Sequence, residues 1–308
     1  MLFEDIDDFS ILKAYAKTHH KDKLYLILRE GKLIRPSQYK RKWHKFFQKV
    51  LTWDDTLVDN KKYFKYYIPQ LLYEKQMYNI PFNKKKSVCI INSNKIGIGK
   101  GELYSERKDI ILFFQDNLKD FDVYGEGWNQ KQLKLMSFLH CAKNILKFNK
   151  RTWKYAFDYF FNFKKVKNYK GRVDGNDTWQ NSSRRCIEVL KDYKFAICYE
   201  NTNADSGYIS EKIFNCMNAR CVPIYLGDPN ILKTIPAGCF IDRRWFESND
   251  DMLRYLVCLK EEKYDEYIMN INNFLFSDKA KLFSEAAYQK RIKMIFGVDS
   301  SYINLKQN

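Results

Sequence analysis

Histidine, glycine and proline are scarce in this chain, and acidic residues are outnumbered by basic ones. Its 308 residues include 4 His, 12 Gly and 6 Pro, and its 54 Lys and Arg outnumber 37 Asp and Glu, giving a formal charge of +17. No Cys-x-x-Cys pair occurs and no histidine lies at ligand spacing from a cysteine, so no metal site is predicted. No apolar run approaches the ~20 residues that a membrane-spanning helix needs. The sequence therefore predicts neither a zinc-binding module nor a membrane-spanning helix.

The cysteines also lack the pattern of a disulfide framework. Several fall within apolar stretches, where a free thiol behaves as a small hydrophobic side chain. No signal peptide is evident near the first residues. These features predict a reducing, cytoplasmic location. The eight cysteines are Cys89, Cys141, Cys186, Cys198, Cys216, Cys221, Cys239 and Cys258.

The excess of positive charge has two explanations. A cationic surface attracts nucleic acid, anionic lipid or nucleotide-like substrates. The chain is also rich in Lys, Asn, Ile, Tyr and Phe, as an AT-rich genome would produce, and we give this explanation the larger weight. Residues 40–49 alternate basic and aromatic side chains, but an amphipathic helix with a solvated basic face explains that pattern. Nucleic acid is therefore not predicted as a partner.

One segment, residues 193–227, carries most of the functional information. It reads YKFAICYENTNADSGYISEKIFNCMNARCVPIYLG. Its apolar runs at 194–199 and 221–226 predict buried parallel strands, and the spacing of apolar residues over 208–219 predicts a helix between them. In open α/β sheets, ligands bind beyond the carboxyl ends of the strands, so residues 200–207 are expected to border a binding site.

A cluster of polar side chains follows the first of these strands. Tyr208, Glu211 and Lys212 have the spacing that brings side chains to one face of a helix. Gly207 would let a ligand approach the backbone, and the start of the helix would attract an anion. The combination suits a nucleotide, with Lys212 at phosphate oxygens and Glu211 at ribose hydroxyls. For an isolated Glu-Lys pair, solvated charges on an ordinary helix would be the simpler interpretation.

The segment resembles the signature of glycosyltransferase family 10, the α-1,3-fucosyltransferases. That signature is a strand, then Glu-Asn, then Gly-Tyr-(Val/Ile)-(Ser/Thr)-Glu-Lys, then Val-Pro-Ile-Tyr-x-Gly. Its parts are found here at residues 200–201, 207–212 and 222–227. The resemblance is strong from about residue 86 to 246, and a long spaced motif of this kind has few chance matches. It implies an α/β fold of the glycosyltransferase-B type, in which two Rossmann-like domains face a cleft.

The chain is expected to divide into three parts. Residues 1–83 would form an acceptor-side domain, short or incomplete for a Rossmann-like domain. Residues 84–277 would form the donor-binding domain. Residues 278–308 would be an amphipathic helix and tail, which we expect to dock on the protein, with contact to an anionic membrane as the minority alternative. Golgi members of the family carry a membrane anchor, so the lack of one favours a soluble enzyme of bacterial or viral type.

The resemblance also implies an activity and assigns roles to side chains. The reaction would be an inverting transfer of L-fucose from GDP-fucose to the 3-hydroxyl of a GlcNAc or Glc unit of a glycan acceptor, without a metal ion. The general base would be Glu30, after the apolar run 24–28, and the cations at the departing diphosphate would be Arg107 and Lys212. The other donor-binding residues would be Glu200, Asn201, Tyr208 and Glu211.

Several alternatives remain open at this point. Glu74 and Glu126 are the reserve candidates for the base. Another nucleotide sugar or linkage would keep the fold and the mechanism. The short first domain and the high charge also permit an inactive nucleotide-binding homologue. Three glycines after a predicted strand suggest a nicotinamide dehydrogenase, but their spacing is not that of the dinucleotide-binding fingerprint; they are Gly97, Gly99 and Gly101.

Overall fold

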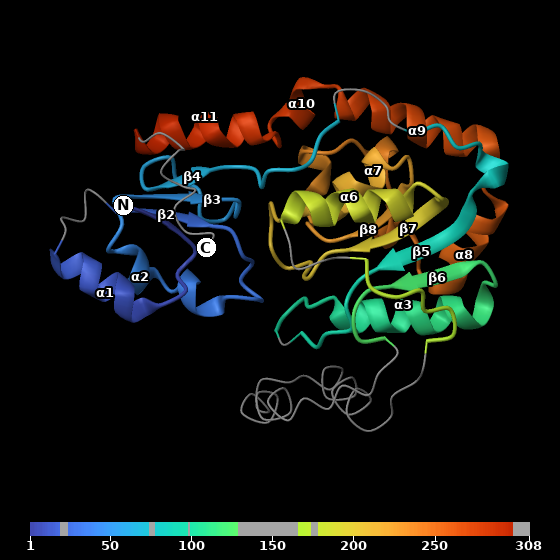
Figure 1. Cartoon of the computed structure of the whole chain (residues 1–308), viewed down its shortest axis with the longest axis horizontal. Helices are drawn as coiled ribbons and strands as arrows, with labels where there is room; N and C mark the ends of the chain where they lie inside the picture. The colour runs from blue at the N-terminus through green and yellow to red at the C-terminus, as the bar shows by residue number, and fades with distance from the viewer. Residues whose placement is uncertain (19–23, 74–77, 98, 129–165, 174–177, 298–308) are drawn as a thin grey trace.

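Two parallel β-sheets organise this computed structural model, which describes residues 1–18, 24–73, 78–97, 99–128, 166–173 and 178–297 (Figure 1). The first sheet has the order β1-β2-β3-β4, with strands Leu2–Glu4, Tyr25–Leu28, Lys49–Thr52 and Tyr63–Lys65. The second has the order β6-β5-β7-β8-β9, with β5 Lys86–Ile91, β6 Phe121–Tyr124, β7 Tyr193–Tyr199, β8 Val222–Leu226 and β9 Ile241–Asp242. Residues 133–163, whose aromatic-rich sequence predicts a helix, lie outside the described residues.

The strands of the second sheet are apolar along nearly their whole length because both faces are covered. β7 is the central strand, and its Ile197 pairs in register with Ile90 of β5 and Ile224 of β8. Strands buried on both faces have continuous apolar runs instead of alternating ones. This property made the strands recognisable, and the predicted runs at 194–199 and 221–226 agree with β7 and β8 to within one residue.

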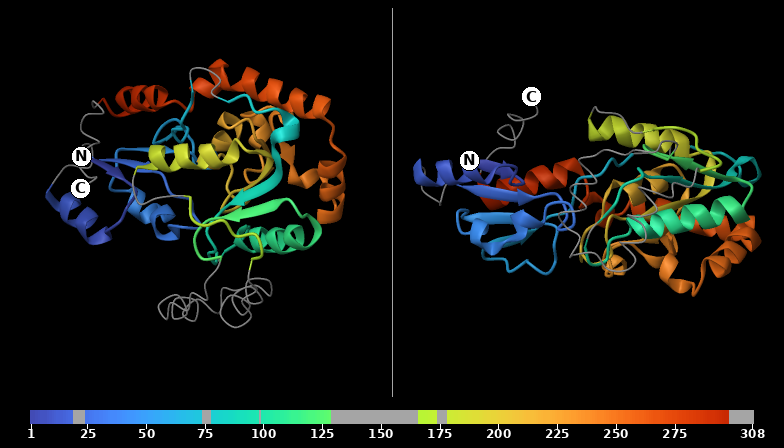
Figure 2. Two further views of the ribbon diagram at one scale, coloured as in Figure 1. Left: turned by 45° about the vertical axis from the view of Figure 1, so that its right-hand side comes forward. Right: turned by 90° about the horizontal axis from the view of Figure 1, so that it is seen from below.

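Helices cover both faces of the second sheet (Figure 2). α3 (Tyr104–Asn117) packs beside β6, whereas α6 (Trp179–Leu190) and α7 (Glu211–Asn218) contact each other and β7 on the opposite face. Right-handed crossovers place these helices on opposite faces of the sheet. The chain moves from β5 to β6 in one direction and then returns past β5 to β7 in the other. The remaining helices of this part are α8 (Asn249–Cys258), α9 (Glu261–Leu275) and α10 (Asp278–Lys281).

Side-chain caps set helix limits that differ from the predicted ones. The helix expected at 208–219 begins only at Glu211, because the Ser210 side chain accepts a hydrogen bond from a backbone N–H of the first turn. The stretch 249–275 forms two helices, α8 and α9, and the amphipathic helix expected from residue 278 onward is likewise divided in two. In the second case Ser284 caps a new helix.

The first sheet is covered by helices from both ends of the chain. α1 (Phe9–Thr18) and α2 (Arg41–His44) belong to one side, where the strand residues Leu26, Leu28 and Val50 are buried. α11 (Glu285–Phe296) packs on the other side. Short 3₁₀ turns complete the chain at Pro36–Tyr39, Phe82–Lys84, Ile231–Lys233, Ala237–Cys239 and Arg243–Trp245.

Helix α11 contributes an apolar face to the core of the first sheet (Figure 1). Its buried residues pack with Ile27, Leu51 and Trp53; they are Tyr288, Ile292, Ile295 and Phe296. The expected docking on the protein is confirmed, and the apolar face is therefore not free to enter a lipid bilayer. Among the helices that the structure describes, none combines the length and the apolar character needed to cross a membrane.

The buried Lys85 joins the second sheet to its helices. Its Nζ donates hydrogen bonds to the carbonyl oxygens of Lys191 at 2.7 Å, Arg220 at 2.9 Å and Tyr193 at 3.3 Å. Lys191 and Arg220 follow α6 and α7, so one ammonium group satisfies carbonyls just beyond the ends of two helices. Burial lowers the pKa of Lys85 to about 8.

Replacing Lys85 by Met should destabilise the protein by about 2–4 kcal/mol, because three carbonyl groups would lose the hydrogen bond from its ammonium group, and only that of Arg220 has a second side-chain donor, the Tyr264 hydroxyl. Urea unfolding measures the loss, with Lys84→Met on the exposed neighbour as the control. The unfolded chain has the higher lysine pKa, so it binds more protons between about pH 8 and the usual 10.5. The stability of the unmodified protein should therefore rise through this window relative to the variant. A Lys85→Met variant as stable as the Lys84→Met control would contradict this account.

Candidate active site

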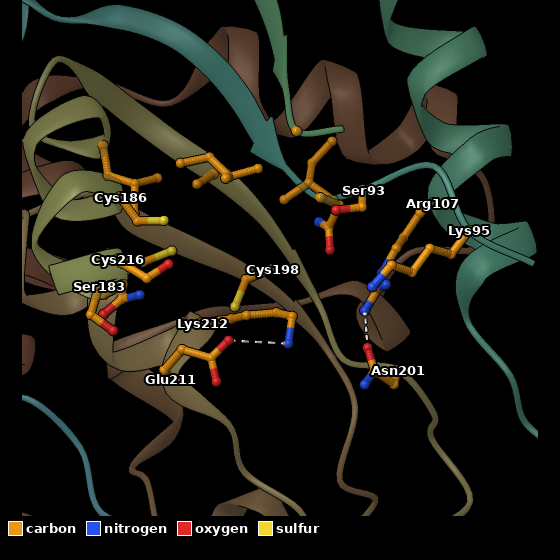
Figure 3. A pocket seen from close by; sticks show the side chains of 18 of the residues that line it. Ser93, Lys95, Arg107, Ser183, Cys186, Cys198, Asn201, Glu211, Lys212 and Cys216 are labelled. Carbon is orange, nitrogen blue, oxygen red and sulfur yellow. Dashed lines mark hydrogen bonds and ion pairs between the residues drawn. The ribbon is translucent and has the colours of Figure 1, made fainter. Parts of the chain in front are cut away.

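A cleft of about 400 Å³ lies beyond the carboxyl ends of β5 and β7 (Figure 3). Between these two strands the direction of strand addition reverses, and open α/β sheets bind ligands at such a switch point. The first domain contributes Glu30 and Ile34 to the lining. The charged side chains of the cleft are Glu30, Lys95, Arg107, Glu211 and Lys212.

Five of the predicted site residues line this cleft: Glu30, Arg107, Asn201, Glu211 and Lys212. Two others, Glu200 and Tyr208, are buried beside it and are not part of its lining. Most of the predicted residues therefore line one cavity, although they come from four separate segments of the chain.

Glu200 binds the residues at the start of α7. Its carboxylate is fully buried and accepts from the backbone N–H of Ser210 at 2.8 Å and from the Ser210 hydroxyl at 2.7 Å. The same carboxylate lies 3.3 Å from the Nζ of Lys212. The glutamate of the Glu-Asn pair thus fixes both the helix cap and the lysine, and its contacts are with the protein.

Lys212 is held at the floor of the cleft with about a fifth of its side chain exposed. Its Nζ donates to Ser210 Oγ at 3.0 Å and lies 3.6 Å from Glu211 Oε1 (Figure 3). Burial opposes the charge, but the carboxylates of Glu200 and Glu211 outweigh it and raise the pKa of Lys212 well above its usual value. The lysine is therefore a fixed cation at neutral pH.

Tyr208 lies before α7, so it does not share a helix face with Glu211 and Lys212 as predicted. Its ring packs edge-on against Trp53 of the first domain, with centroids 4.9 Å apart. The preceding Gly207 has a φ of +86°, and a Cβ there would lie 2.4 Å from the carbonyl oxygen of Trp53. This loop therefore needs glycine for close contact with the first domain.

Arg107 points inward from α3. Its Nη2 donates to the carbonyl of Tyr199 at 2.7 Å and to Asn201 Oδ1 at 3.1 Å, and the guanidinium lies over the Tyr104 ring at 4.8 Å. The side chain is buried, so Arg107 is not a solvated charge on the helix surface. Burial lowers the pKa of Arg107, and the guanidinium borders the cleft with its remaining edge (Figure 3).

Glu30 enters the cleft from the loop after β2. Its carbonyl oxygen accepts a hydrogen bond of 2.7 Å from the Tyr39 hydroxyl. Burial, and next the charge of Asp5, raise the pKa of the Glu30 carboxyl. Of the reserve bases, Glu126 is exposed and is not among the cleft residues, and Glu74 lies outside the described residues.

Sequence reasoning missed three residues that follow β5 and line the cleft: Asn92, Ser93 and Lys95. Their position directly after a predicted strand was the available signal. In the same loop, a Cβ on Gly97 would lie 2.3 Å from the Tyr104 ring. This glycine therefore makes room for an aromatic side chain, which accounts for it without a nicotinamide cofactor. Within the described ranges no group of three or more His, Cys, Asp or Glu is arranged to hold a metal ion.

The chain is similar to known glycosyltransferases. Residues 162–288 match the C-terminal model of glycosyltransferase family 10 (fucosyltransferase). Over 105 residues the chain is 30% identical to the alpha-(1,3)-fucosyltransferase FucT of Helicobacter pylori. That alignment covers 33% of this chain and only 22% of the relative.

Solved structures agree with the fold. A crystal structure of an alpha1,3-fucosyltransferase superposes with a TM-score of 0.50 at 14% identity, covering 98% of this chain and 79% of the other. An α-glucosyltransferase in complex with UDP-glucose and DNA gives a TM-score of 0.56 at 10% identity, covering 96% and 80%. The two parallel sheets thus form a fold of the glycosyltransferase-B type. The sequence similarity to glycosyltransferase family 10, the fucosyltransferase family, lies in residues 162–288 of this chain, and the similarity of fold extends over nearly all of it.

Proposed function

We propose that this protein transfers L-fucose from GDP-fucose, with inversion, to the 3-hydroxyl of a GlcNAc or Glc unit of a glycan acceptor. The observation that carries the proposal is the meeting of Glu30 with Arg107 and Lys212 in one cleft, at the carboxyl edge of the second sheet. The cleft thus combines a carboxylate that follows a strand of the first sheet with two cations from helices of the second. Such a site can hold an anionic leaving group on one side and activate a hydroxyl on the other.

The donor would bind on the side of the second sheet. Lys212 and the first backbone N–H groups of α7 would contact the diphosphate, and Arg107 would add a second cation. Both side chains are already fixed by hydrogen bonds to the protein, so little reorganisation is needed when charge develops on the departing diphosphate. Glu211, half exposed at the helix start, is placed for the ribose hydroxyls.

The acceptor would bind on the side of the first sheet. Glu30 would take the proton from the acceptor hydroxyl as that oxygen attacks the anomeric carbon of fucose, while the bond from this carbon to the diphosphate breaks. The base and the leaving group then lie on opposite faces of the sugar, which gives inversion. The raised pKa of Glu30 brings its basicity closer to neutral pH than that of an exposed carboxylate.

Product analysis tests this proposal. The purified protein is incubated with lactose or N-acetyllactosamine as the acceptor. Each reaction contains one nucleotide sugar, either GDP-fucose or another donor, and the products are examined by mass spectrometry and NMR. We expect one added deoxyhexose, at the 3-position and only with GDP-fucose. Transfer of another sugar, or another linkage, would replace the donor or acceptor assignment. GDP binding by calorimetry without any transfer would support an inactive nucleotide-binding homologue.

A further inference from the structure

The carboxylate of Asp5 accepts hydrogen bonds from the backbone at Glu30. Asp5 follows β1, is buried, and has a φ of +55°. Its Oδ1 accepts from the N–H of Arg29 at 2.7 Å, and both carboxylate oxygens lie 3.2 Å from the N–H of Glu30. Asp is one of the few residues that adopts such a φ readily. The unusual backbone of Asp5 thus aims a carboxylate at the peptide groups that carry Glu30.

The peptide of Glu30 is held on its other side as well. Its carbonyl oxygen accepts from Tyr39 and, at 3.3 Å, from the Nε2 of the buried Gln38. Gln38 Nε2 also donates to Asp5 Oδ1 at 2.9 Å. Asp5, Gln38 and Tyr39 therefore enclose both polar groups of one residue, and this leaves the backbone of Glu30 little freedom to move.

Among the charged groups near Glu30, Asp5 has the largest effect on the pKa of the Glu30 carboxyl. The carboxylates of Asp5 and Glu211 raise the pKa of Glu30, and the guanidinium groups of Arg35 and Arg29 lower it. Both guanidinium groups are engaged elsewhere, since Arg29 pairs with Glu4 at 3.1 Å and Arg35 pairs with Asp7. Glu211 and the phenols of Tyr104 and Tyr208 are the groups that face Glu30 from the second domain, and Lys212 lines the same cleft.

We propose that Asp5 is the positioning residue of the catalytic carboxylate: it fixes the Glu30 backbone in the cleft and holds a negative charge close behind the Glu30 side chain. This inference rests on the proposed function, in which Glu30 is the base. An aspartate that served only the fold would also accept these hydrogen bonds, but its replacement would not alter the proton affinity of Glu30.

Asp5→Asn and Asp5→Gly test the proposal. Asparagine and glycine both tolerate positive φ, so the pair guards against loss of folding in either variant. Both remove a negative charge, so the acid limb of kcat/KM should move to lower pH. The looser backbone of Glu30 should lower kcat about tenfold to a hundredfold, with KM for GDP-fucose unchanged. Asp8→Asn is the matched control, because it removes an exposed charge from the same segment.

Two further measurements distinguish an error in the assignment of Glu30 as the base from an error in the proposed role of Asp5. If Glu30→Gln retains turnover, the assignment of the base is wrong, whatever Asp5 does. If Glu30→Gln is inactive while both Asp5 variants keep the kcat and the acid limb of the unmodified protein, the role of Asp5 alone is overturned. NMR of isotope-labelled glutamate carboxyls, with Glu30→Gln to assign the signal, gives an answer independent of activity. The Glu30 titration should shift to lower pH in Asp5→Asn, and an unshifted titration would refute the proposal.

Discussion

Glu30→Gln is expected to lower kcat by about 10²–10⁴-fold while leaving the affinity for GDP nearly unchanged, because the amide keeps the size of the side chain but cannot accept the acceptor proton. The side chain lines the cleft from the first domain, whereas the proposed cations come from the second. Steady-state kinetics and GDP calorimetry measure the two effects separately. Glu126→Gln, on an exposed residue after β6, is the control.

The pH dependence of the unmodified protein gives an independent check of the same residue. A general base works only when ionised, and burial together with Asp5 raises the pKa of Glu30 above the usual 4.5. The acid limb of kcat/KM should therefore lie above that value, and the residual activity of Glu30→Gln should lack it. Turnover of Glu30→Gln close to that of the control would remove Glu30 from the mechanism.

Lys212→Ala should reduce kcat/KM by about 10²–10³-fold, because it removes a preorganised cation from the departing diphosphate. The same change should cost about 3–5 kcal/mol of stability, because Glu200 would remain as a buried carboxylate without its cation. Kinetics with GDP-fucose and urea unfolding measure these losses. Unchanged kinetics would show that the start of α7 holds the phosphates without the lysine.

The double variant Glu200→Gln with Lys212→Ala separates the two roles of the lysine. Glutamine at 200 removes the buried charge and can still accept from Ser210, so much of the stability should return. Activity should stay low, because the cation is still missing from the cleft. If the double variant recovers both stability and activity, Lys212 serves only to neutralise Glu200.

The sequence predicted strands better than helix ends, for physical reasons. β7 and β8 are buried on both faces, so their apolar runs alone define them. The start of α7 depends on the hydroxyl of Ser210 and on its contacts with Glu200. The spacing of apolar residues contains no information about these polar contacts. For this reason Tyr208 was assigned to the helix, although its ring contacts Trp53 of the first domain.

The members of the cleft were predicted more easily than the contacts that hold them. Glu30, Glu211 and Lys212 follow strands or begin a helix, and positions of that kind border sites in α/β folds. The link between Asp5 and Glu30 joins residues that follow β1 and β2, and the pairing of these two strands is formed only in the folded protein. The inward direction of Arg107 likewise depends on the carbonyl of Tyr199, which is distant in sequence. Such partners become visible only after the chain has folded.

The return of α11 to the first sheet has a consequence for biosynthesis. The strands of this sheet leave the ribosome early, but the helix that covers Ile27, Leu51 and Trp53 is made more than two hundred residues later. Until then the apolar surface that α11 covers in the folded protein is exposed, and exposed apolar surface of this kind promotes aggregation. Expression of residues 1–83 alone should therefore yield insoluble protein, and supplying the α11 peptide in trans should rescue it.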